Sequence, residues 1–337
     1  MRLFAVGDQS QVAEVRREAS TIGRSSGLGE VDIGRLALVV TELGTNQLKH
    51  AARGEILVGL YEDETGSGVE VVGIDRGPGI RNLAESFRDG YSTAGGAGQG
   101  LGSLRRQSDI FDIATWPERG TVAVSRVAGR KASHAPLSTR KFSWGGMSVA
   151  ISGEDVCGDA YTVRAEGGRL STVVADGLGH GPIAATASTA AVRAFSAVNQ
   201  APPVDILRGM HEALRPTRGA AVAVLQLDAM TAHYAGIGNI AGAVLRSDGI
   251  SRMVSVPGTL GVTQTKARSF TYPAGPGSLV VLTSDGLSTG WQLDLYPGLT
   301  RAHPTLIAAV IFRDFSRRRD DATVLVIRVE APEKAGS

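Results

Sequence analysis

The sequence predicts an α+β protein of two domains, first a layer of helices on a β-sheet and then a β-sandwich flanked by helices. The chain has 337 residues, more than one hydrophobic core usually organises, so two domains are expected. Helix-like stretches open the sequence, whereas strand-like runs dominate its second half. Between them, residues 128–141 form a polar, basic linker interrupted by Pro136 and without helical or strand periodicity.

The first predicted domain covers residues 1–127. Helical periodicity is present at residues 9–26 and 30–52. Strand-like runs follow at residues 55–63 and 68–75, separated by a Gly/Ser turn. A glycine-rich region, a short helix and two further strands complete the domain. This order predicts helices on one face of a mixed sheet.

The second predicted domain covers residues 142–330 and is richer in strands. Eight runs of β-branched residues end in or close to Gly, Asp, Ser or Glu, which indicates a two-sheet sandwich. Helical patterns at residues 181–199, 203–214 and 304–315 are expected to cover the outer faces of the sheets. The eight runs are residues 141–152, 160–167, 169–176, 219–228, 233–238, 241–249, 278–285 and 322–330.

Charge and cysteine content exclude several classes of protein. The 35 Lys and Arg residues nearly balance 33 Asp and Glu residues, so no overall field favours nucleic acid or an anionic membrane as a partner. Cys157 is the only cysteine, which excludes an intrachain disulfide and suits a reducing compartment. No apolar run approaches the roughly 18 residues needed to cross a bilayer. We therefore expect a cytoplasmic protein.

The helix predicted at residues 30–52 carries polar side chains on one side. Glu42, Asn46 and Lys49 share that side because they are separated by four and three residues. A carboxylate, an amide and an ammonium are suited to a magnesium triphosphate. Taken alone, the same pattern fits a solvated helix face. Apolar side chains fall on the opposite side, at Ile33, Leu36, Val40 and Leu43.

Two glycine-rich motifs follow. Asp75 ends a strand-like run and precedes Gly77 and Gly79, which would let a ligand approach the backbone. Residues 95–102 contain five glycines directly before a helix, where exposed N–H groups suit phosphate oxygens. Each motif alone could be an ordinary turn or linker. Their order after the polar helix favours a nucleotide site, although no P-loop motif occurs.

These three elements resemble the Bergerat-type ATP site of histidine kinases, Hsp90 and anti-sigma factors, over nearly all of residues 1–127. The resemblance implies that Asn46 ligates Mg²⁺ and that Asp75 accepts the adenine amino group of ATP. We include Lys49, on the same helix face as Asn46, among the cofactor-binding residues. The remaining implied ATP-site residues are Gly77 and Gly79 in the base pocket, Gly98, Gly100 and Gly102 in the phosphate lid, and Thr121 at the adenine end.

One position distinguishes branches of this family. Histidine kinases usually have Asn at the first N-box position, whereas serine kinases resembling RsbT and RsbW have Glu, and this chain has Glu42. A carboxylate near the γ-phosphate can take the proton from an attacking serine hydroxyl. Glu42 is therefore the predicted general base of a serine kinase.

Three acidic motifs are expected to end strands of the second domain. They are Asp176 and Asp285, each before a glycine, and the pair Asp320 and Asp321. Asp159 lies in a further Gly-Asp motif. A single Asp-Gly pair usually marks a turn. Several carboxylates at strand ends can instead converge at one edge of a sandwich, where they would select Mg²⁺ or Mn²⁺.

The order of these motifs resembles the SpoIIE-like branch of the PPM metal-dependent phosphatases, close to RsbX and RsbU, over residues 142–330. Two divalent ions would activate a bridging water and neutralise the phosphoryl oxygens during in-line attack. Gly238 and Asn239 match a family turn with an expected structural role. By this resemblance Asp176 bridges both metals and is the central catalytic residue, the Gly177 carbonyl ligates one metal, Asp285 and Asp320 bind the other, and Asp159 holds a water at the metals.

Three other features carry weaker functional signals. A cysteine phosphatase would need an arginine six residues after Cys157, where Val163 stands, so Cys157 is expected to be a buried structural residue. His180 lies between glycines and is expected to shape its loop, with a role as ligand or acid left open. No arginine for the substrate phosphate is evident. Residues 317–319 are three arginines that could serve, although such runs are usually solvated.

The preferred function is a bifunctional switch enzyme. Its first domain would phosphorylate Ser or Thr on a STAS-domain anti-sigma antagonist or a stressosome-like scaffold, and its second domain would remove such phosphates. A second hypothesis makes the first domain an ATP-sensing or partner-docking module beside an active phosphatase. A third is an anti-sigma factor with a vestigial phosphatase. Glu42 and Asn46 favour the first hypothesis, and oligomerisation stays open.

Overall fold

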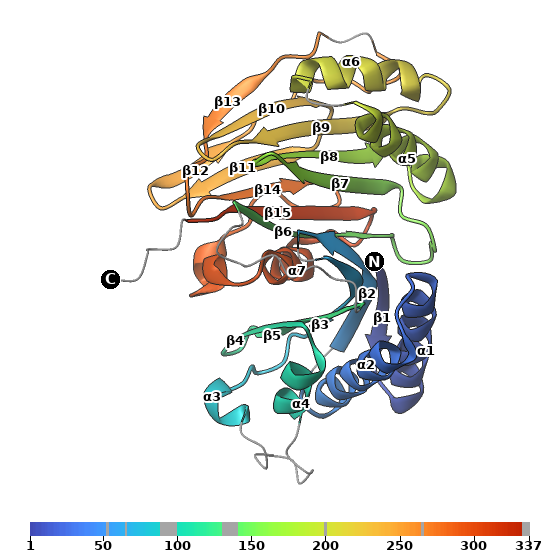
Figure 1. Ribbon diagram of the computed structural model, residues 1–337, viewed down its shortest axis with the longest axis vertical. Coiled ribbons are helices and arrows are strands. Elements are labelled where there is room, and N and C mark those ends of the chain that lie inside the picture. The colour runs from blue at the N-terminus through green and yellow to red at the C-terminus, as the bar shows by residue number, and fades with distance from the viewer. Residues whose placement is uncertain are drawn as a thin grey trace. The chain divides into compact units, whose positions relative to one another are not determined.

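The computed structural model describes residues 1–51, 54–64, 66–87, 100–129, 141–198, 201–263 and 266–331 (Figure 1). The chain divides into two compact units. Unit 1 comprises Met1–Ala135 with Gln292–Arg313, and unit 2 comprises Pro136–Trp291 with Asp314–Ser337. The predicted α+β class with two domains is confirmed. Most of the predicted linker, residues 128–141, lies outside the described residues, so the domain limits stay a prediction.

Unit 1 contains a five-stranded sheet with the order β1-β2-β3-β5-β4. The predicted mixed sheet is wrong, because every neighbouring pair of strands is antiparallel. Two successive helices connect β1 to β2. Because they bring the chain back to the end of the sheet where β1 ends, β2 runs in the opposite direction to β1. Short turns join β2 to β3 and β4 to β5, which also forces reversal. The strands are β1 (Arg2–Val6), β2 (Gly54–Asp63), β3 (Gly66–Ile74), β4 (Ile110–Trp116) and β5 (Gly120–Ala128).

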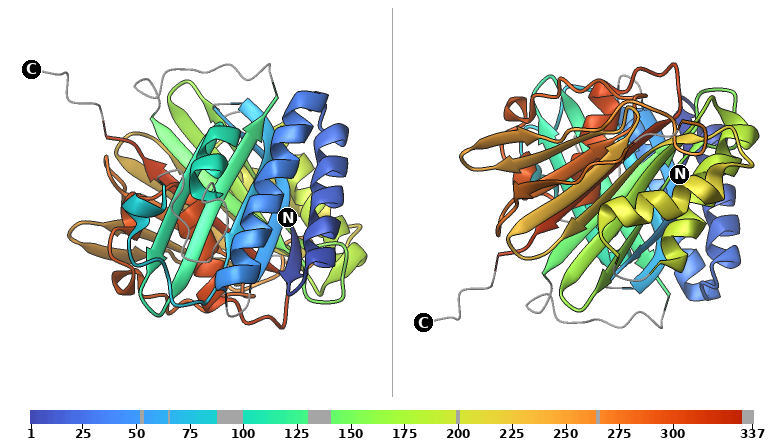
Figure 2. Two further views of the ribbon diagram at one scale, coloured as in Figure 1. Left: turned by 90° about the horizontal axis from the view of Figure 1, so that it is seen from below. Right: turned by 90° about the horizontal axis from the view of Figure 1, so that it is seen from above.

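The helices between β1 and β4 cover one face of this sheet (Figure 2, left). Helix α1 (Gln9–Ser25) starts at Asp8, whose carboxylate accepts hydrogen bonds from the amides of Ser10 and Gln11. The Gln11 side chain accepts from the Asp8 amide and completes a capping box. These caps explain why the helix begins where the sequence predicts. The other helices are α2 (Glu30–His50), α3 (Leu83–Ser86) and α4 (Gly100–Gln107).

The apolar face predicted for α2 is confirmed. Its four apolar side chains at Ile33, Leu36, Val40 and Leu43 are buried in the core between the helices and the sheet. Apolar side chains recurring every three or four residues place a continuous stripe against the strands. The polar face of α2 is therefore turned away from this core.

Unit 2 contains two five-stranded sheets, β13-β10-β9-β8-β7 and β12-β11-β14-β15-β6. All eight predicted strands are present. The prediction missed β12 (Gly249–Arg252) and β13 (Phe270–Pro273), which have four residues each and bury none of them, so they carry no buried apolar run. The eight predicted strands are β6 (Phe142–Val149), β7 (Asp159–Glu166), β8 (Arg169–Gly177), β9 (Ala220–Leu227), β10 (Thr231–Ile237), β11 (Ala241–Arg246), β14 (Leu279–Thr283) and β15 (Ala322–Val329).

The two sheets of unit 2 enclose one core, and helices α5 (Gly181–Ala197) and α6 (Pro203–Leu214) bury a second core against β8, β9 and β10 (Figure 1). Helix α7 (Pro304–Phe315) has the predicted limits, but up to Arg313 it belongs to unit 1, together with the short 3₁₀ helices η2 (Leu293–Leu295) and η3 (Leu299–Arg301). All ten residues from Pro304 to Arg313 are buried. Because α7 is buried on every side, its sequence has no single apolar face that would indicate which surface it packs against. No helix in the described stretches is long and apolar enough to cross a bilayer.

The burial of α2 generates a stability prediction. Leu36 is fully buried, whereas Leu38 on the same helix is 50% exposed. Leu36→Ala should lower the free energy of unfolding by about 2–5 kcal/mol, since it removes core contacts and leaves a cavity. Leu38→Ala is the matched control and should change it by less than about 0.5 kcal/mol. Urea unfolding followed by circular dichroism measures both, and equal losses would contradict the assigned face.

Candidate functional site

The polar face of α2 meets the start of α4. A methyl group added at Gly100 would lie 3.3 Å from Asn46 Oδ1 and 3.6 Å from Glu42 Oε2. The structure therefore brings together three residues predicted for the triphosphate end of a nucleotide site. Lys49 lies one turn further along α2 and is exposed. Gly102 is buried within α4, and Gly98 lies outside the described residues.

Glu42 has the electrostatic character of a base. Its partial burial raises the pKa of its carboxyl, and the positive charge of Lys49 opposes that rise. A carboxylate with a raised pKa accepts a proton more readily than an exposed one. Asn46, one turn away, offers a neutral amide oxygen of the kind that Mg²⁺ binds.

Asp75 organises the other end of the candidate nucleotide site. Its Oδ1 accepts hydrogen bonds from the Gly77 amide at 2.7 Å and the Thr121 amide at 3.3 Å. Its own amide donates to the Thr121 carbonyl at 3.0 Å. Burial raises the pKa of the Asp75 carboxyl, and the two amide hydrogen bonds oppose that rise. The predicted residues Asp75, Gly77 and Thr121 thus lie side by side.

Two glycines permit this close approach. Gly79 has a φ of +77°, and a Cβ there would lie 2.5 Å from the Trp116 carbonyl oxygen. Gly120 has a φ of +76°, and a Cβ there would lie 2.1 Å from the Asp75 carbonyl oxygen. Only glycine fits both the left-handed backbone and the contact distance. Gly120 was not among the predicted residues, although a glycine directly before Thr121 was the available signal.

Carboxylates meet at one end of the β7–β8 pair in unit 2. Asp159 begins β7 and lies opposite Asp176 in the β-ladder. Asp176 is within hydrogen-bonding reach of both Asp159 and Asp285. Burial, followed by the negative charges of Asp159 and Asp285, raises the pKa of Asp176 to about 9. Burial is also the main cause that raises the pKa of Asp159 to about 7.

Asp285 follows β14 and is held by a neighbouring loop. Asn239 Nδ2 donates a hydrogen bond to Asp285 Oδ2 at 2.6 Å. Burial and the charge of Asp320 raise the pKa of Asp285, while Arg317 and the Asn239 hydrogen bond oppose the rise. The Gly238–Asn239 turn, predicted to be structural, therefore orients one of the predicted metal ligands directly.

Asp320 and Asp321 were expected to end a strand, but they directly precede β15, and the two acids differ in environment. Asp321 is buried, and its two carboxylate oxygens accept hydrogen bonds from the amides of Ile151 at 2.7 Å and Gly158 at 2.6 Å. These bonds tie the loop before Asp159 to the start of β15. Asp320 is less buried and interacts with Asp285 and Asp159. The sequence could not tell which of the two acids has a structural role.

The acidic cluster (Asp159, Asp176, Asp285 and Asp320) has the donor chemistry of a site for a hard divalent cation. In the described part of the chain, the side-chain positions bring no three or more His, Cys, Asp or Glu residues together in a group that could hold a metal ion. The Asp159 Oδ2 atom is nevertheless buried without a hydrogen-bond partner. Repulsion among the carboxylates would also be relieved by positive charge. An all-oxygen donor set of this kind suits Mg²⁺ or Mn²⁺.

The remaining candidates lie around this cluster. His180 precedes α5, and its Nδ1 lies 3.0 Å from Glu154 Oε1, so it pairs with that carboxylate at the surface. Burial raises the pKa of the Cys157 thiol, which disfavours the reactive thiolate. Sequence reasoning missed Arg218, whose Nη1 lies 3.7 Å from the position of a Cβ at Gly179. Arg218 belongs to no motif, so only the fold reveals that it lies beside the loop after Asp176.

Two family models match separate parts of the chain. Residues 6–126 match the histidine kinase-like ATPase domain, and residues 166–330 match the stage II sporulation protein E (SpoIIE) family. Both segments contain the residues described above, with Glu42, Asn46 and Asp75 in the first and Asp176, Asp285 and Asp320 in the second.

Individual proteins are similar to the same two parts. The serine/threonine-protein kinase RsbT of Bacillus subtilis (strain 168) is 30% identical over 110 residues, which are 33% of this chain and 83% of RsbT. The phosphoserine phosphatase RsbX of the same organism is 28% identical over 141 residues, which are 40% of this chain and 70% of RsbX. A solved structure described as "The bacterial stressosome: a modular system that has been adapted to control secondary messenger signaling" is 32% identical, with a TM-score of 0.53 over 56% of this chain and 100% of its own. The chain therefore belongs to the RsbT-like family of histidine kinase-like ATPases through its N-terminal domain, and its C-terminal half matches the SpoIIE family.

Proposed function

We propose that this protein is a bifunctional switch enzyme that both adds and removes phosphate on Ser or Thr residues of a partner protein. The observation that carries the proposal is the clustering of Asp176 with Asp159 and Asp285 in one unit, in a chain whose RsbT-like unit brings Glu42, Asn46 and Gly100 together. Each unit then has its own phosphoryl-transfer chemistry.

In the phosphatase reaction, Asp176, Asp285, Asp320 and the Gly177 carbonyl would hold two Mg²⁺ or Mn²⁺ ions. Bound ions would lower the pKa of water and offset the charge of the phosphoryl oxygens. Asn239 keeps Asp285 in place through its 2.6 Å hydrogen bond. Asp159 is buried opposite Asp176 in the β-ladder and would hold a water at the metals. This set needs no phosphorylated enzyme intermediate.

In the kinase reaction, Asp75 and Thr121 would bind the adenine of ATP, and Asn46 would hold Mg²⁺. The Asp75 Oδ1 atom already accepts two amide hydrogen bonds, which leaves Oδ2 for the adenine amino group. Glu42 would take the proton from the attacking hydroxyl, because burial raises the pKa of its carboxyl. Gly98, Gly100 and Gly102 would enclose the phosphates.

The protein substrate would be a STAS-domain antagonist or a stressosome-like scaffold. The similarity to RsbT over most of that kinase's length and the similarity to a stressosome structure support this choice. Phosphorylation by one unit and dephosphorylation by the other would set the fraction of partner that is phosphorylated. Partner switching in the cytoplasm is the setting that this chemistry suits.

The first test concerns the acidic cluster. The protein should hydrolyse p-nitrophenyl phosphate with Mn²⁺ or Mg²⁺, and Asp176→Asn should lower kcat by more than about 100-fold, since even groups that only orient metal ligands contribute 10- to 100-fold. Asp205→Asn on the exposed surface of α6 is the matched control and should keep full activity. Turnover that persists in EDTA, or in Asp176→Asn, would remove the two-metal mechanism.

The second test concerns adenine recognition. Asp75→Asn preserves an oxygen for the Gly77 and Thr121 amides but replaces the acceptor for the adenine amino group with a donor. ATP affinity measured by calorimetry with Mg²⁺ should fall by about 10- to 100-fold. Wild-type protein should also bind ATP more tightly than GTP. Equal affinities for the two nucleotides would count against this pocket.

The third test separates a kinase from a nucleotide-sensing module. In an Asp176→Asn background, which prevents removal of the product, Glu42→Gln should keep ATP binding but lower transfer of labelled γ-phosphate to a STAS-domain protein by about 10²- to 10⁴-fold. Glu14→Gln, at an exposed position of α1, is the matched control. Asn46→Ala should lose both binding and transfer. If ATP binds and no STAS-domain protein is labelled, the kinase assignment is wrong and the regulatory reading replaces it.

A further inference from the structure

Residues Gln292–Arg313, here named the docking segment, belong to unit 1 although they lie in the chain between Asp285 and Asp320. Hydrogen bonds in unit 2 close the chain on both sides of this segment. The Ser288 amide donates to the Phe315 carbonyl at 2.9 Å, and the Arg317 amide donates to the Gly286 carbonyl at 2.8 Å. The docking segment is therefore a long insertion in unit 2. Hydrogen bonds hold its two ends together close in sequence to Asp285 and Asp320.

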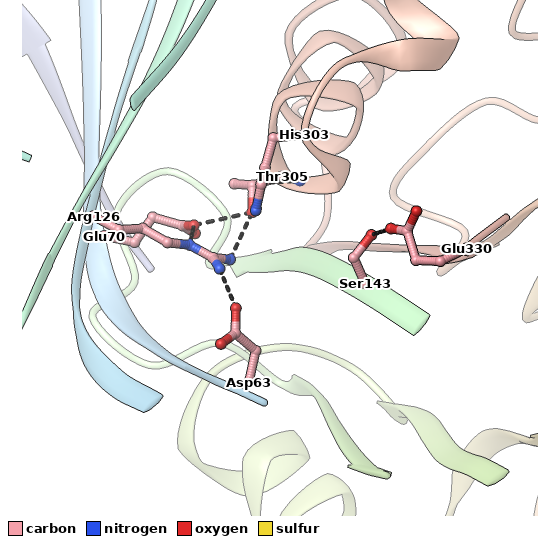
Figure 3. Close-up of polar contacts among 7 residues, drawn as sticks. All are labelled: Asp63, Glu70, Arg126, Ser143, His303, Thr305 and Glu330. Carbon is pink, nitrogen blue, oxygen red and sulfur yellow. Dashed lines mark hydrogen bonds and ion pairs between the residues drawn. The ribbon is translucent and has the colours of Figure 1, made fainter. Parts of the chain in front are cut away.

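The docking segment enters a buried network of charges in unit 1 (Figure 3). Arg126 on β5 is 2% exposed, and its side chain bonds both Glu70, at 2.5 Å, and Asp63. The Thr305 hydroxyl at the start of α7 accepts from Arg126 Nη2 at 3.0 Å and donates to Glu70 Oε2 at 2.9 Å. Thr305 thus satisfies both members of a buried ion pair at once.

Further contacts hold the segment along the β4–β5 hairpin. Trp116 Nε1 donates to the Pro297 carbonyl at 3.1 Å, and the Trp116 ring meets Tyr296 edge to face with centroids 5.1 Å apart. The Asp112 carboxylate accepts a hydrogen bond from the His303 amide at 2.7 Å. Directional bonds at several places leave one register for the segment rather than a sliding hydrophobic contact.

The last residue of the docking segment contacts the candidate adenine site. Arg313 is 2% exposed, and its Nη1 donates to the Asp75 carbonyl oxygen at 2.9 Å. The Arg76 side chain donates in turn to the Arg313 carbonyl. The Asp75 carboxylate, by contrast, accepts hydrogen bonds from the Gly77 and Thr121 amides. Asp75 therefore contributes its side chain to the candidate nucleotide site and its backbone carbonyl to the contact with the docking segment.

We propose that the adjacent strands β3, β5 and β4 of unit 1 form a docking surface for this segment, through which nucleotide bound at Asp75 controls the phosphatase site. This inference rests on the proposed function, because it needs both sites. A ligand that moves the Asp75–Arg76 backbone changes the hydrogen bonds to Arg313, and the chain leads from Arg313 to Asp320 in seven residues. By linkage, metal bound at the acidic cluster changes nucleotide affinity by the same factor by which bound nucleotide changes metal affinity.

The experiment follows hydrogen–deuterium exchange and p-nitrophenyl phosphate turnover in the full chain, with and without Mg²⁺ and a non-hydrolysable ATP analogue. In the wild type, the analogue should change exchange of the amides of Ser288 and Arg317, and it should change the Mn²⁺ concentration that gives half-maximal turnover by about fivefold or more. Asp75→Asn, at analogue concentrations that saturate only the wild type, controls for chelation of metal by the nucleotide.

Variants of Thr305 test the route. Thr305→Val keeps the shape of the side chain but removes the hydroxyl, so both nucleotide effects should fall at least threefold while the analogue still binds. Thr305→Ser is the matched control and should retain them. Trp116→Phe, which loses the bond to Pro297 and part of the ring packed against Tyr296, is a second uncoupling variant if Thr305→Val unfolds.

Two outcomes overturn the inference. One is an analogue that binds in calorimetry without changing exchange or turnover in the wild type. The other is Thr305→Val and Trp116→Phe behaving like the wild type. Absence of any nucleotide binding is a different result, which would refute the proposed ATP site itself and the inference with it.

Discussion

The ion pair between Glu70 and Arg126 is the interaction on which unit 1 depends most. The two residues face each other across β3 and β5, and both are almost completely buried. Burial alone would lower the pKa of Arg126, but the charges of Glu70 and Asp63 outweigh it and raise that pKa. Loss of one partner would leave an uncompensated charge, which typically costs about 3–5 kcal/mol. The pair therefore sets the strand register that puts Asp75 beside Thr121.

Unit 2 depends on the opposite arrangement, in which like charges are gathered. The ladder between β7 and β8 puts Asp159 opposite Asp176, and the loop of Asn239 holds Asp285 next to them. Such repulsion lowers the stability of the unit unless protons or cations compensate it. Sites that break the rules of stable packing in this way are where function is expected. The Asp159 Oδ2 atom, which is buried without a hydrogen-bond partner, adds a further unfavourable contribution to the stability of this region.

An enzyme that both forms and hydrolyses the same kind of phosphoester would consume ATP without effect if both activities ran together. A physical link between the two sites would prevent this. The docking segment supplies a candidate, because its buried bonds to Arg126, Glu70 and Asp75 each have one preferred geometry. Contacts that tolerate only one geometry break rather than deform, so a small shift at a ligand site could be converted into a change of state.

The sequence alone determined the α+β class, both families of motif, all helices longer than one turn and eight of the ten strands of unit 2, because these follow from local periodicity, glycine placement and turn residues. It also supplied the candidate residues Glu42, Asn46, Asp75 and Asp176, whose roles stay predictions. Only the tertiary structure decided the antiparallel order of the first sheet, the structural role of Asp321 and the membership of residues 292–313 in unit 1. Those features depend on contacts between residues up to 238 positions apart. They could not be predicted, because local patterns in one sequence do not indicate which distant residues a buried side chain contacts.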